Sequence, residues 1–285
     1  ISKSFYRGAK YHWQIDTLGV EGQRIRFFET QAIKESFKSL KLINAHKEIS
    51  SIRLNKDEKE IKCLKKAIEI SEKSLEQTLQ YIKTGMSEIE IKNFLIQALY
   101  KNGGEGLSFD PIVLTGANSA LPHGHSSENN IIKKGDTLLF DFGATYEGFN
   151  ADITRTFFII EADEYQREAY NNVLDANKVG INNSIIPKTM HDVDNETTLV
   201  LENGKFKEFI VHKTGHGLGL DVHEDPYIVR GNKASLEKGM IITVEPGLYI
   251  PGKFGIRIED DVVITDNDPQ ILTSFSKELR IINNE

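Results

Sequence analysis

The chain has 285 residues, enough for one large domain or for one domain with part of a second. Hydrophobic residues make up 39% and charged residues 27%, the usual balance of a soluble globular protein. The net charge of −7 argues against nucleic acid as the main partner, and no apolar run approaches the roughly 20 residues that cross a bilayer.

The single cysteine, Cys63, excludes an internal disulfide framework and a zinc site built from several cysteines. It lies in KDEKEIKCLKKAIEI, a helical pattern with no histidine nearby, and is interpreted as a thiol without a catalytic role. A reducing compartment is expected, which means the cytoplasm.

Residues 1–55 contain short apolar stretches with several polar breaks, and the run FKSLKLI within them is expected to be helical. A domain boundary is placed near residue 55. Beyond it, Asn55 and Glu58 form a capping-box pattern that starts a helix reaching about Lys83. Ser87 with Glu90 starts a second helix in the same way. The apolar positions at helical spacing are Ile61, Leu64, Ile68, Leu75, Leu79 and Ile82 in the first helix and Ile91, Phe94, Leu95, Ala98 and Leu99 in the second.

After residue 105 the apolar residues change period and form short β-rich runs. Helical segments interrupt these runs at Tyr165–Lys178 and Met190–Glu202. The mixture predicts an α+β domain with a substantially antiparallel sheet. The runs are FDPIVL, DTLLFDF, ITRTFFII, MIITVEPGLYI and IRIEDDVVIT.

Three carboxylates lie inside these apolar β runs, where an acid is unexpected. Asp141 lies in TLLFDFGA, Glu245 in IITVEPGLY and Glu259 in GIRIEDDVVI. An ionised carboxylate buried in a sheet is destabilising unless a cation or several donors compensate it. One such residue could form a salt bridge, whereas three together indicate a shared partner.

Two hairpins are predicted to bring these acids together. Asp141 and Asp152 are 11 residues apart with the turn-like YEGFN between them, and Glu245 and Glu259 are 14 apart around PGKFG. Each hairpin would place two acids roughly opposite each other, where like charges repel. A divalent cation such as Mn²⁺ turns that repulsion into coordination. The alternative, two polar hairpin tips with solvated acids, fits the apolar flanking residues poorly.

The segment HKTGHGLGLDVHE adds three histidines, His212, His216 and His223. Its glycine spacing does not match a dinucleotide fingerprint and instead suits a loop that lets backbone approach a ligand. One imidazole joined to four carboxylates would make a two-metal site. HExxH, G-x-S-x-G and the Walker A lysine loop are all missing from the sequence.

The runs LLFDFGATYEGFNADITRTF, HKTGHGLGLDVHE, ITVEPGLYIPG and GIRIEDDVVIT together resemble the Xaa-Pro dipeptidases (prolidases) and aminopeptidase P enzymes. The resemblance extends from about residue 56 to LTSFSKEL near the C-terminus, and includes LPHGH at Leu121–His125. It implies the pita-bread fold of creatinase and the aminopeptidases, with a curved, largely antiparallel sheet and flanking helices. Residues 1–55 resemble the end of the family's creatinase-like N-terminal domain, and residues 56–285 the catalytic domain.

The resemblance also implies a set of metal ligands. Asp141 would hold one metal, His216 and Glu245 the other, and Asp152 and Glu259 both. Two divalent ions per subunit are expected, Mn²⁺ or Co²⁺ in the first place and Zn²⁺ as a further option. Glu245 would also move a proton to the leaving nitrogen.

Five further residues receive expected roles. His223 or His123 would donate to the oxyanion formed during catalysis. His212 would line the substrate pocket. Arg257 lies two residues before Glu259, on the same strand face, and would brace a ligand carboxylate or bind substrate. Arg230 would recognise the substrate's C-terminal carboxylate.

The expected function is therefore hydrolysis of Xaa-Pro bonds in small peptides with proline at the second position, by metal-activated water. The choice between Xaa-Pro dipeptidase and Xaa-Pro aminopeptidase stays open. Three alternatives also remain: a methionine or general aminopeptidase, a non-catalytic peptide-binding pseudo-peptidase, and creatinase-like hydrolysis of a small amide. All five ligand positions are filled, which speaks against the last two. The family implies a homodimer, with no nucleic-acid or membrane partner.

Overall fold

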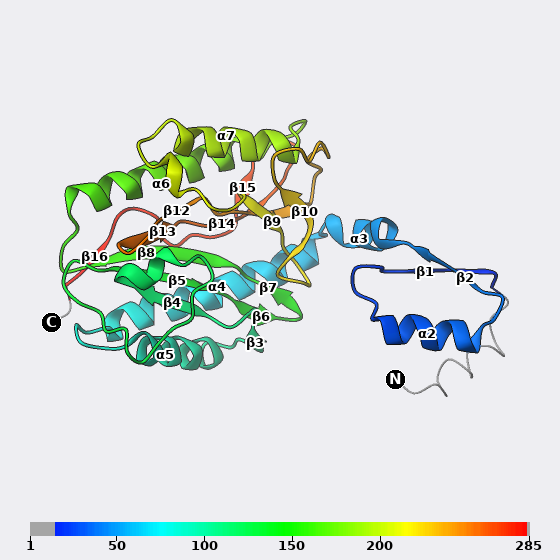
Figure 1. Cartoon of the computed structure of the whole chain (residues 1–285), viewed down its shortest axis with the longest axis horizontal. Helices are drawn as coiled ribbons and strands as arrows, with labels where there is room; N and C mark the ends of the chain where they lie inside the picture. Colours follow the sequence, from blue (N-terminus) through cyan, green and yellow to red (C-terminus); the bar gives the residue numbers. More distant parts are fainter. Residues whose placement is uncertain (1–14, 284–285) are drawn as a thin grey trace. The chain divides into compact units, whose positions relative to one another are not determined.

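A computed structural model describes residues 15–283 of the chain. The chain forms two compact units, Ile1–Arg53 and Leu54–Glu285, and the sequence analysis placed a boundary near residue 55. That the first unit is the end of a creatinase-like domain stays a prediction. The second unit contains every element that the expected metal site uses (Figure 1).

In its described part, which starts at residue 15, the first unit contains two short strands and two helices. Strand β1 (Thr17–Val20) pairs in parallel with β2 (Lys41–Asn44). Helix α2 (Phe27–Ser36) connects the two strands in the chain, and α3 (His46–Leu54) follows β2. The helix expected in FKSLKLI is wrong. Its second half is strand β2, because pairing with β1 satisfies backbone groups that local helical spacing alone did not account for.

Helix α4 (Glu58–Tyr81) begins two residues later than expected. Its N-cap is Asp57, whose carboxylate accepts a hydrogen bond from the Glu60 backbone N–H at 2.9 Å, while the Asp57 backbone N–H donates to the Glu60 carboxylate at 2.8 Å. Asn55 is extended and forms a β-bridge with Met240, so it is not available as the cap. The capping-box logic was right, and tertiary pairing moved its position.

The remaining helices follow the sequence closely. The Ser87 and Glu90 capping box is confirmed and starts α5 (Glu88–Lys101). Helix α7 (Met190–Glu202) has the expected bounds, while α6 (Glu164–Asn183) is longer than expected at both ends. Within residues 15–283, no helix has the length and apolar character needed to cross a bilayer.

The strands of the second unit pair antiparallel, with the exception of β16 beside β8. Their orders are β10-β9-β11-β14-β15, β16-β8-β5-β4, β3-β6-β7 and β12-β13. The predicted α+β class with a largely antiparallel sheet is therefore confirmed. The bounds are β3 (Gly106–Leu107), β4 (Ile112–Thr115), β5 (Thr137–Phe142), β6 (Ala144–Tyr146), β7 (Phe149–Asn150), β8 (Ile153–Ile159), β9 (Gly215–Gly217), β10 (Glu224–Ile228), β11 (Ile241–Val244), β12 (Gly247–Ile250), β13 (Phe254–Arg257), β14 (Asp260–Val263), β15 (Gln270–Ile271) and β16 (Ile281–Ile282), with short 3₁₀ turns η1 (Gly116–Ala120) and η2 (Lys207–Phe209).

Two long apolar runs are each split into two strands, and an acid lies at each break. MIITVEPGLYI divides into β11 and β12 around Glu245, and IRIEDDVVIT divides into β13 and β14 around Glu259. Pro246 cannot donate to a ladder, which ends β11 there. The register is the same on both sides of the break, so Glu245 and Glu259 face each other across it.

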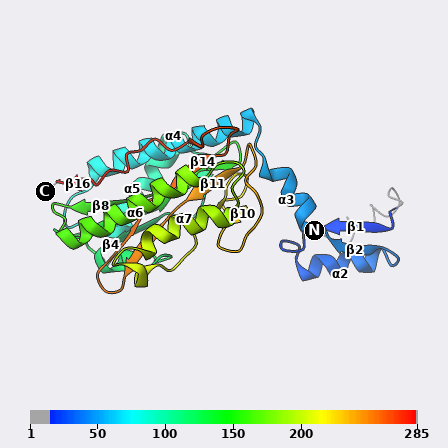
Figure 2. The same cartoon turned by 90° about the horizontal axis from the view of Figure 1, so that it is seen from above.

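The strands lie between two pairs of helices (Figures 1 and 2). Apolar side chains of α4 and α5 pack with those of β4, β5 and β8 in one buried cluster. Side chains of α6 and α7 pack with β12 and β13 in another. This double cover buries both faces of the central strands and so takes the acids on them away from water.

Gly143 allows the first pair of acids to approach. It follows β5, and a Cβ atom at this position would lie 1.8 Å from the Ala151 carbonyl oxygen. The Ala151 N–H instead bonds the Ala144 carbonyl at 3.0 Å. This close crossing brings the chain back so that Asp152 lies beside Asp141.

Candidate metal centre

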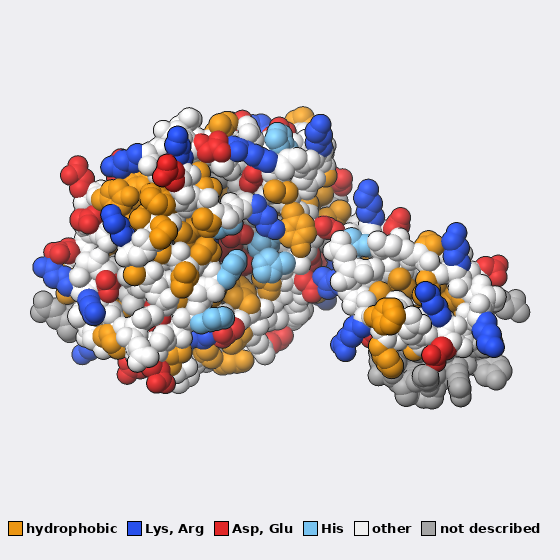
Figure 3. Space-filling model, in the orientation of Figure 1, with side chains coloured by type: hydrophobic (Ala, Val, Ile, Leu, Met, Phe, Trp, Pro, Cys, Tyr) orange, Lys and Arg blue, Asp and Glu red, His pale blue; other side chains and the backbone are white. Residues whose placement is uncertain are grey.

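Four carboxylates and one imidazole converge on a single cavity of about 290 Å³ in the second unit. They come from five separate segments: Asp141 from β5, Asp152 from the start of β8, His216 from β9, Glu245 from the end of β11 and Glu259 from the start of β14. The structure therefore brings together all five residues expected as ligands. Figure 3 shows histidine side chains gathered over this hollow, with carboxylates between them.

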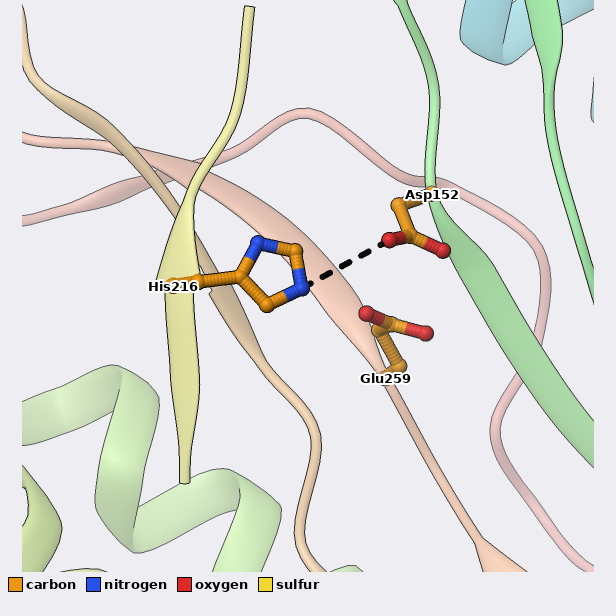
Figure 4. Close-up of side chains that lie close together, drawn as sticks. All are labelled: Asp152, His216 and Glu259. Atoms are coloured by element: carbon orange, nitrogen blue, oxygen red, sulfur yellow. Dashed lines mark ion pairs between the residues drawn. The ribbon is translucent and has the colours of Figure 1, made fainter. Parts of the chain in front are cut away.

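Three of these side chains point directly toward one another (Figure 4). Asp152, His216 and Glu259 each offer one ligand atom, and these atoms all lie within 4.8 Å of one another. His216 Nε2 lies 3.7 Å from Asp152 Oδ2 and 3.3 Å from Glu245 Oε1. These distances are too long for hydrogen bonds of good geometry and suit ligand atoms arranged around a cation.

The protonation of His216 decides what can bind between these groups. Its Nδ1 lies 3.0 Å from the Gly217 carbonyl, which can only accept, so Nδ1 carries the proton. Burial, with His223 nearby, lowers the pKa of His216 to about 3, so the ring is neutral near pH 7. The Nε2 lone pair therefore faces carboxylate oxygens. Acceptors that face one another in a buried site need a cation, and this tautomer is the one that ligates metal.

The buried acids of the site also repel one another. Burial, followed by the charges of Glu259 and Asp141, raises the pKa of Asp152 well above its usual value. Burial and Glu245 do the same to the pKa of Glu259. Burial raises the pKa of Glu245 to about 7, although Arg257 opposes the shift. The donor set thus fits divalent cations, because cations would remove the repulsion that holds protons on these acids.

Arg257 joins two of the acids through a buried network. Its guanidinium forms an ion pair with Asp141 and donates from Nε to the Thr154 hydroxyl at 3.0 Å. That hydroxyl donates to Glu259 Oε2 at 2.7 Å. Arg257 also donates to the Tyr249 hydroxyl at 2.5 Å. The side chain therefore fixes carboxylates on two different strands.

The other histidines line the same cavity. His212 Nδ1 lies 2.8 Å from the Lys213 carbonyl and Nε2 lies 2.8 Å from the Tyr249 hydroxyl. Burial, together with Arg257, lowers the pKa of His212 to about 4, so it is neutral and accepts from the tyrosine. His123 and His223 are exposed at the cavity, and the His223 ring centroid lies 4.2 Å from that of His216.

Arg230 is the one candidate that the structure does not bring to the cavity. Its guanidinium forms a bidentate pair with Glu202 at 2.6 and 3.0 Å, and its backbone N–H donates to Asp194. It is not among the residues that line the cavity. The expected contact with a substrate carboxylate therefore has no support from its position.

The sequence analysis did not single out two residues that lie at the site. Lys213 lines the cavity between His212 and His216, and Tyr249 supports His212 and Arg257 from β12. Lys213 stands inside the quoted histidine motif, which was the available signal. Tyr249 carried none, because a tyrosine in a buried strand is ordinary core.

A further acid, Glu88, holds the loop that carries His123. Glu88 is fully buried at the start of α5, and its carboxylate accepts hydrogen bonds from the backbone N–H groups of Thr115 (2.7 Å) and Ser127 (2.9 Å). It also accepts from the side-chain amides of Asn118 and Asn130. These bonds tie both ends of the loop to one point.

Glu88→Gln is therefore expected to lower the free energy of unfolding by about 2 kcal/mol, because the new NH₂ group meets donors where an acceptor is needed. Urea denaturation measures this, and limited proteolysis should cut the loop faster in the variant. Glu128→Gln, an exposed change in the same loop, is the matched control and should behave as wild type. Equal stability of Glu88→Gln and wild type would contradict the assignment.

An α+β fold that brings two buried carboxylates, two half-buried ones and an imidazole to one cavity offers the ligand types of a hydrolytic metal centre. The sequence model of metallopeptidase family M24 matches residues 62–266, and the chain belongs to this family. The protein is thus a metallopeptidase, and its fold is the expected pita-bread fold.

Named relatives agree with this placement. The chain is 35% identical over 268 residues to an Xaa-Pro dipeptidase of Pyrococcus furiosus, covering 93% of this chain and 75% of that protein. An X-Pro aminopeptidase structure from Thermotoga maritima aligns with a TM-score of 0.94 at 37% identity, over 98% of this chain and 78% of that one. An Xaa-Pro dipeptidase structure from Bacillus anthracis aligns with a TM-score of 0.93 at 38% identity, again over 98% and 78%.

Proposed function

We propose that the protein hydrolyses Xaa-Pro bonds in small peptides, using two divalent cations. The observation that carries the proposal is the neutral His216 ring, whose Nε2 lone pair faces the carboxylates of Asp152 and Glu245 at 3.7 and 3.3 Å. Relatives named Xaa-Pro dipeptidase and X-Pro aminopeptidase support proline as the second substrate residue.

We assign the ligands as the sequence analysis did. Asp141 would hold one cation, His216 and Glu245 the other, and Asp152 and Glu259 both. Mn²⁺ or Co²⁺ suits a set of four carboxylates and one imidazole best, and Zn²⁺ also fits. When bound, the cations lower the pKa of a shared water and polarise the scissile carbonyl.

The remaining residues would orient the substrate and move protons. Glu245, whose carboxylate lines the cavity, would take a proton from the attacking water and give it to the proline nitrogen. His223 or His123, at the cavity mouth, would donate to the oxyanion. His212 would line the pocket, and Arg257 would keep Asp141 and Glu259 in place.

The cavity, at about 290 Å³, lies at the small end of the range for ligand sites, which suits a short peptide. A homodimer and a cytoplasmic location are further parts of the proposal, supported by family resemblance and by the single cysteine.

Incubation with Ala-Pro and Mn²⁺ or Co²⁺ tests the function, with metal content measured on the same sample. We expect release of alanine and proline, and little release of methionine from Met-Ala-Ser. The opposite preference would favour a methionine or general aminopeptidase. Bound metal without cleavage of either peptide would favour a pseudo-peptidase.

A further inference from the structure

A dipeptide substrate brings a negative charge into an acidic cavity. An extended residue spans about 3.6 Å, so the C-terminal carboxylate of a dipeptide lies only about 7 Å from its amino end. It must therefore sit in the same cavity as Asp141, Asp152, Glu245 and Glu259. A carboxylate placed there needs a cation of its own.

Few side chains can supply this cation. The lysine and arginine side chains that line the cavity are those of Lys213 and Arg257. Arg257 is buried and bound to Asp141, Thr154 and Tyr249, so its charge is already paired. His216 is assigned to a cation, and both ring nitrogens of His212 already have partners in the Lys213 carbonyl and the Tyr249 hydroxyl.

Lys213 is the cation that remains. Among residues 15–283 it forms no ion pair, and its Nζ lies 3.8 Å from the centre of the Tyr227 ring. Burial lowers the pKa of Lys213, as it does for an ammonium withdrawn from water, although Glu245 and Asp194 oppose the shift. The ring of Tyr227, on β10 opposite His216, holds the ammonium at the cavity without neutralising it.

We propose that Lys213 binds the C-terminal carboxylate of the substrate and so gives the protein a preference for Xaa-Pro dipeptides over C-terminally blocked or longer Xaa-Pro peptides. The inference rests on the proposed function and deepens it, since it chooses between dipeptidase and aminopeptidase action. It also replaces Arg230, which is paired with Glu202 away from the cavity.

The test compares kcat/KM for Ala-Pro and for its C-terminal amide, which lacks the negative charge. Wild type should prefer Ala-Pro by about ten- to a hundredfold, the usual worth of a hydrogen bond to a charged group. Lys213→Met should reduce this ratio to near one, mainly through KM for Ala-Pro, and Lys213→Glu should invert it. Lys213→Arg should keep most of the preference.

Two further measurements separate carboxylate binding from a structural role. Lys213→Gln covers the case in which the methionine variant folds poorly, and melting temperatures are recorded for all variants. Calorimetric titration with L-proline and L-prolinamide gives a binding readout, in which wild type should favour proline and Lys213→Met should not. Lys238→Met removes an exposed lysine paired with Asp266 and is the matched control.

The outcomes are distinguishable. A substrate ratio that stays unchanged in folded Lys213→Met and Lys213→Gln, with both substrates still cleaved, would overturn this inference and leave the proposed function intact. Equal losses for both substrates would indicate a structural role and also overturn it. Failure of wild type to cleave either substrate with any divalent metal would remove the proposed function together with the inference.

Discussion

Asp152→Ala is expected to lower kcat/KM for Ala-Pro by at least about a thousandfold, since loss of a partner outside the ligand shell alone already costs 10- to 100-fold. The side chain is buried beside His216 and Glu259 and is assigned to both cations, so its loss should also reduce the bound metal. Steady-state kinetics and elemental analysis of the same preparation measure the two effects.

In the metal-free protein, removing the charge of Asp152 should increase stability. Burial and neighbouring acids hold the pKa of Asp152 high, which means that its charge is unfavourable in the folded protein without cations. Asp152→Asn keeps the shape and removes this repulsion, so the chelator-treated variant should melt at a higher temperature than chelator-treated wild type. Function and apo stability therefore conflict at this position.

Asp175→Asn provides the control, because Asp175 is exposed on α6 and contacts none of the ligands. It should match wild type in kinetics, metal content and melting temperature. Robust cleavage by Asp152→Ala, or full metal content in this variant, would contradict the assignment of Asp152 as a ligand of both cations.

Removal of metal should make stability fall as pH rises. The pKa of Glu245 goes from its ordinary 4.5 to about 7 in the folded chain, so between these values the folded state holds a proton that the unfolded state has lost. The free energy of unfolding then falls by about 1.4 kcal/mol per pH unit for one such group, or roughly 3 kcal/mol in all. Asp152 and Glu259 shift in the same direction and add to the loss, whereas the lowered pKa values of His212 and His216 oppose it below pH 6.5.

Urea denaturation of chelator-treated protein from pH 4.5 to 8 measures this slope. Saturating Mn²⁺ should remove most of it, because bound cations keep the acids ionised and compensated. In the metal-free protein, Glu245→Gln should reduce the slope of unfolding free energy against pH by about 1.4 kcal/mol per pH unit, the contribution of one proton. Parallel profiles with and without metal would show that the acids are already neutralised by the protein itself.

Local signals in the sequence determined much of the second unit. Capping boxes and helical spacing predicted α4, α5 and α7, because these depend on residues within a few positions of each other. Asp141, Glu245 and Glu259 stood out because a carboxylate in an apolar strand needs a partner. The two hairpins that flank them are present in the structure at the turns the spacing indicated.

What depended on distant contacts was not predicted. The start of α4 moved to Asp57 because Asn55 pairs with Met240, 185 positions away in the chain. The second half of FKSLKLI forms strand β2 because it pairs with β1. The local spacing of apolar residues predicts neither contact, because both are formed by backbone N–H and C=O groups, which nearly every residue carries.

By itself, the sequence predicted that four carboxylates share a cation, and the family resemblance added His216 to the predicted set. Only the tertiary structure decided which acid each basic side chain pairs with. Arg257 is bound to Asp141, Arg230 to Glu202, and Lys213 to no carboxylate among the described residues. The physical reason is that the need to compensate a buried charge can be read from the residues around it in the chain. The identity of the compensating group depends on distances of a few ångströms, which only the folded chain sets.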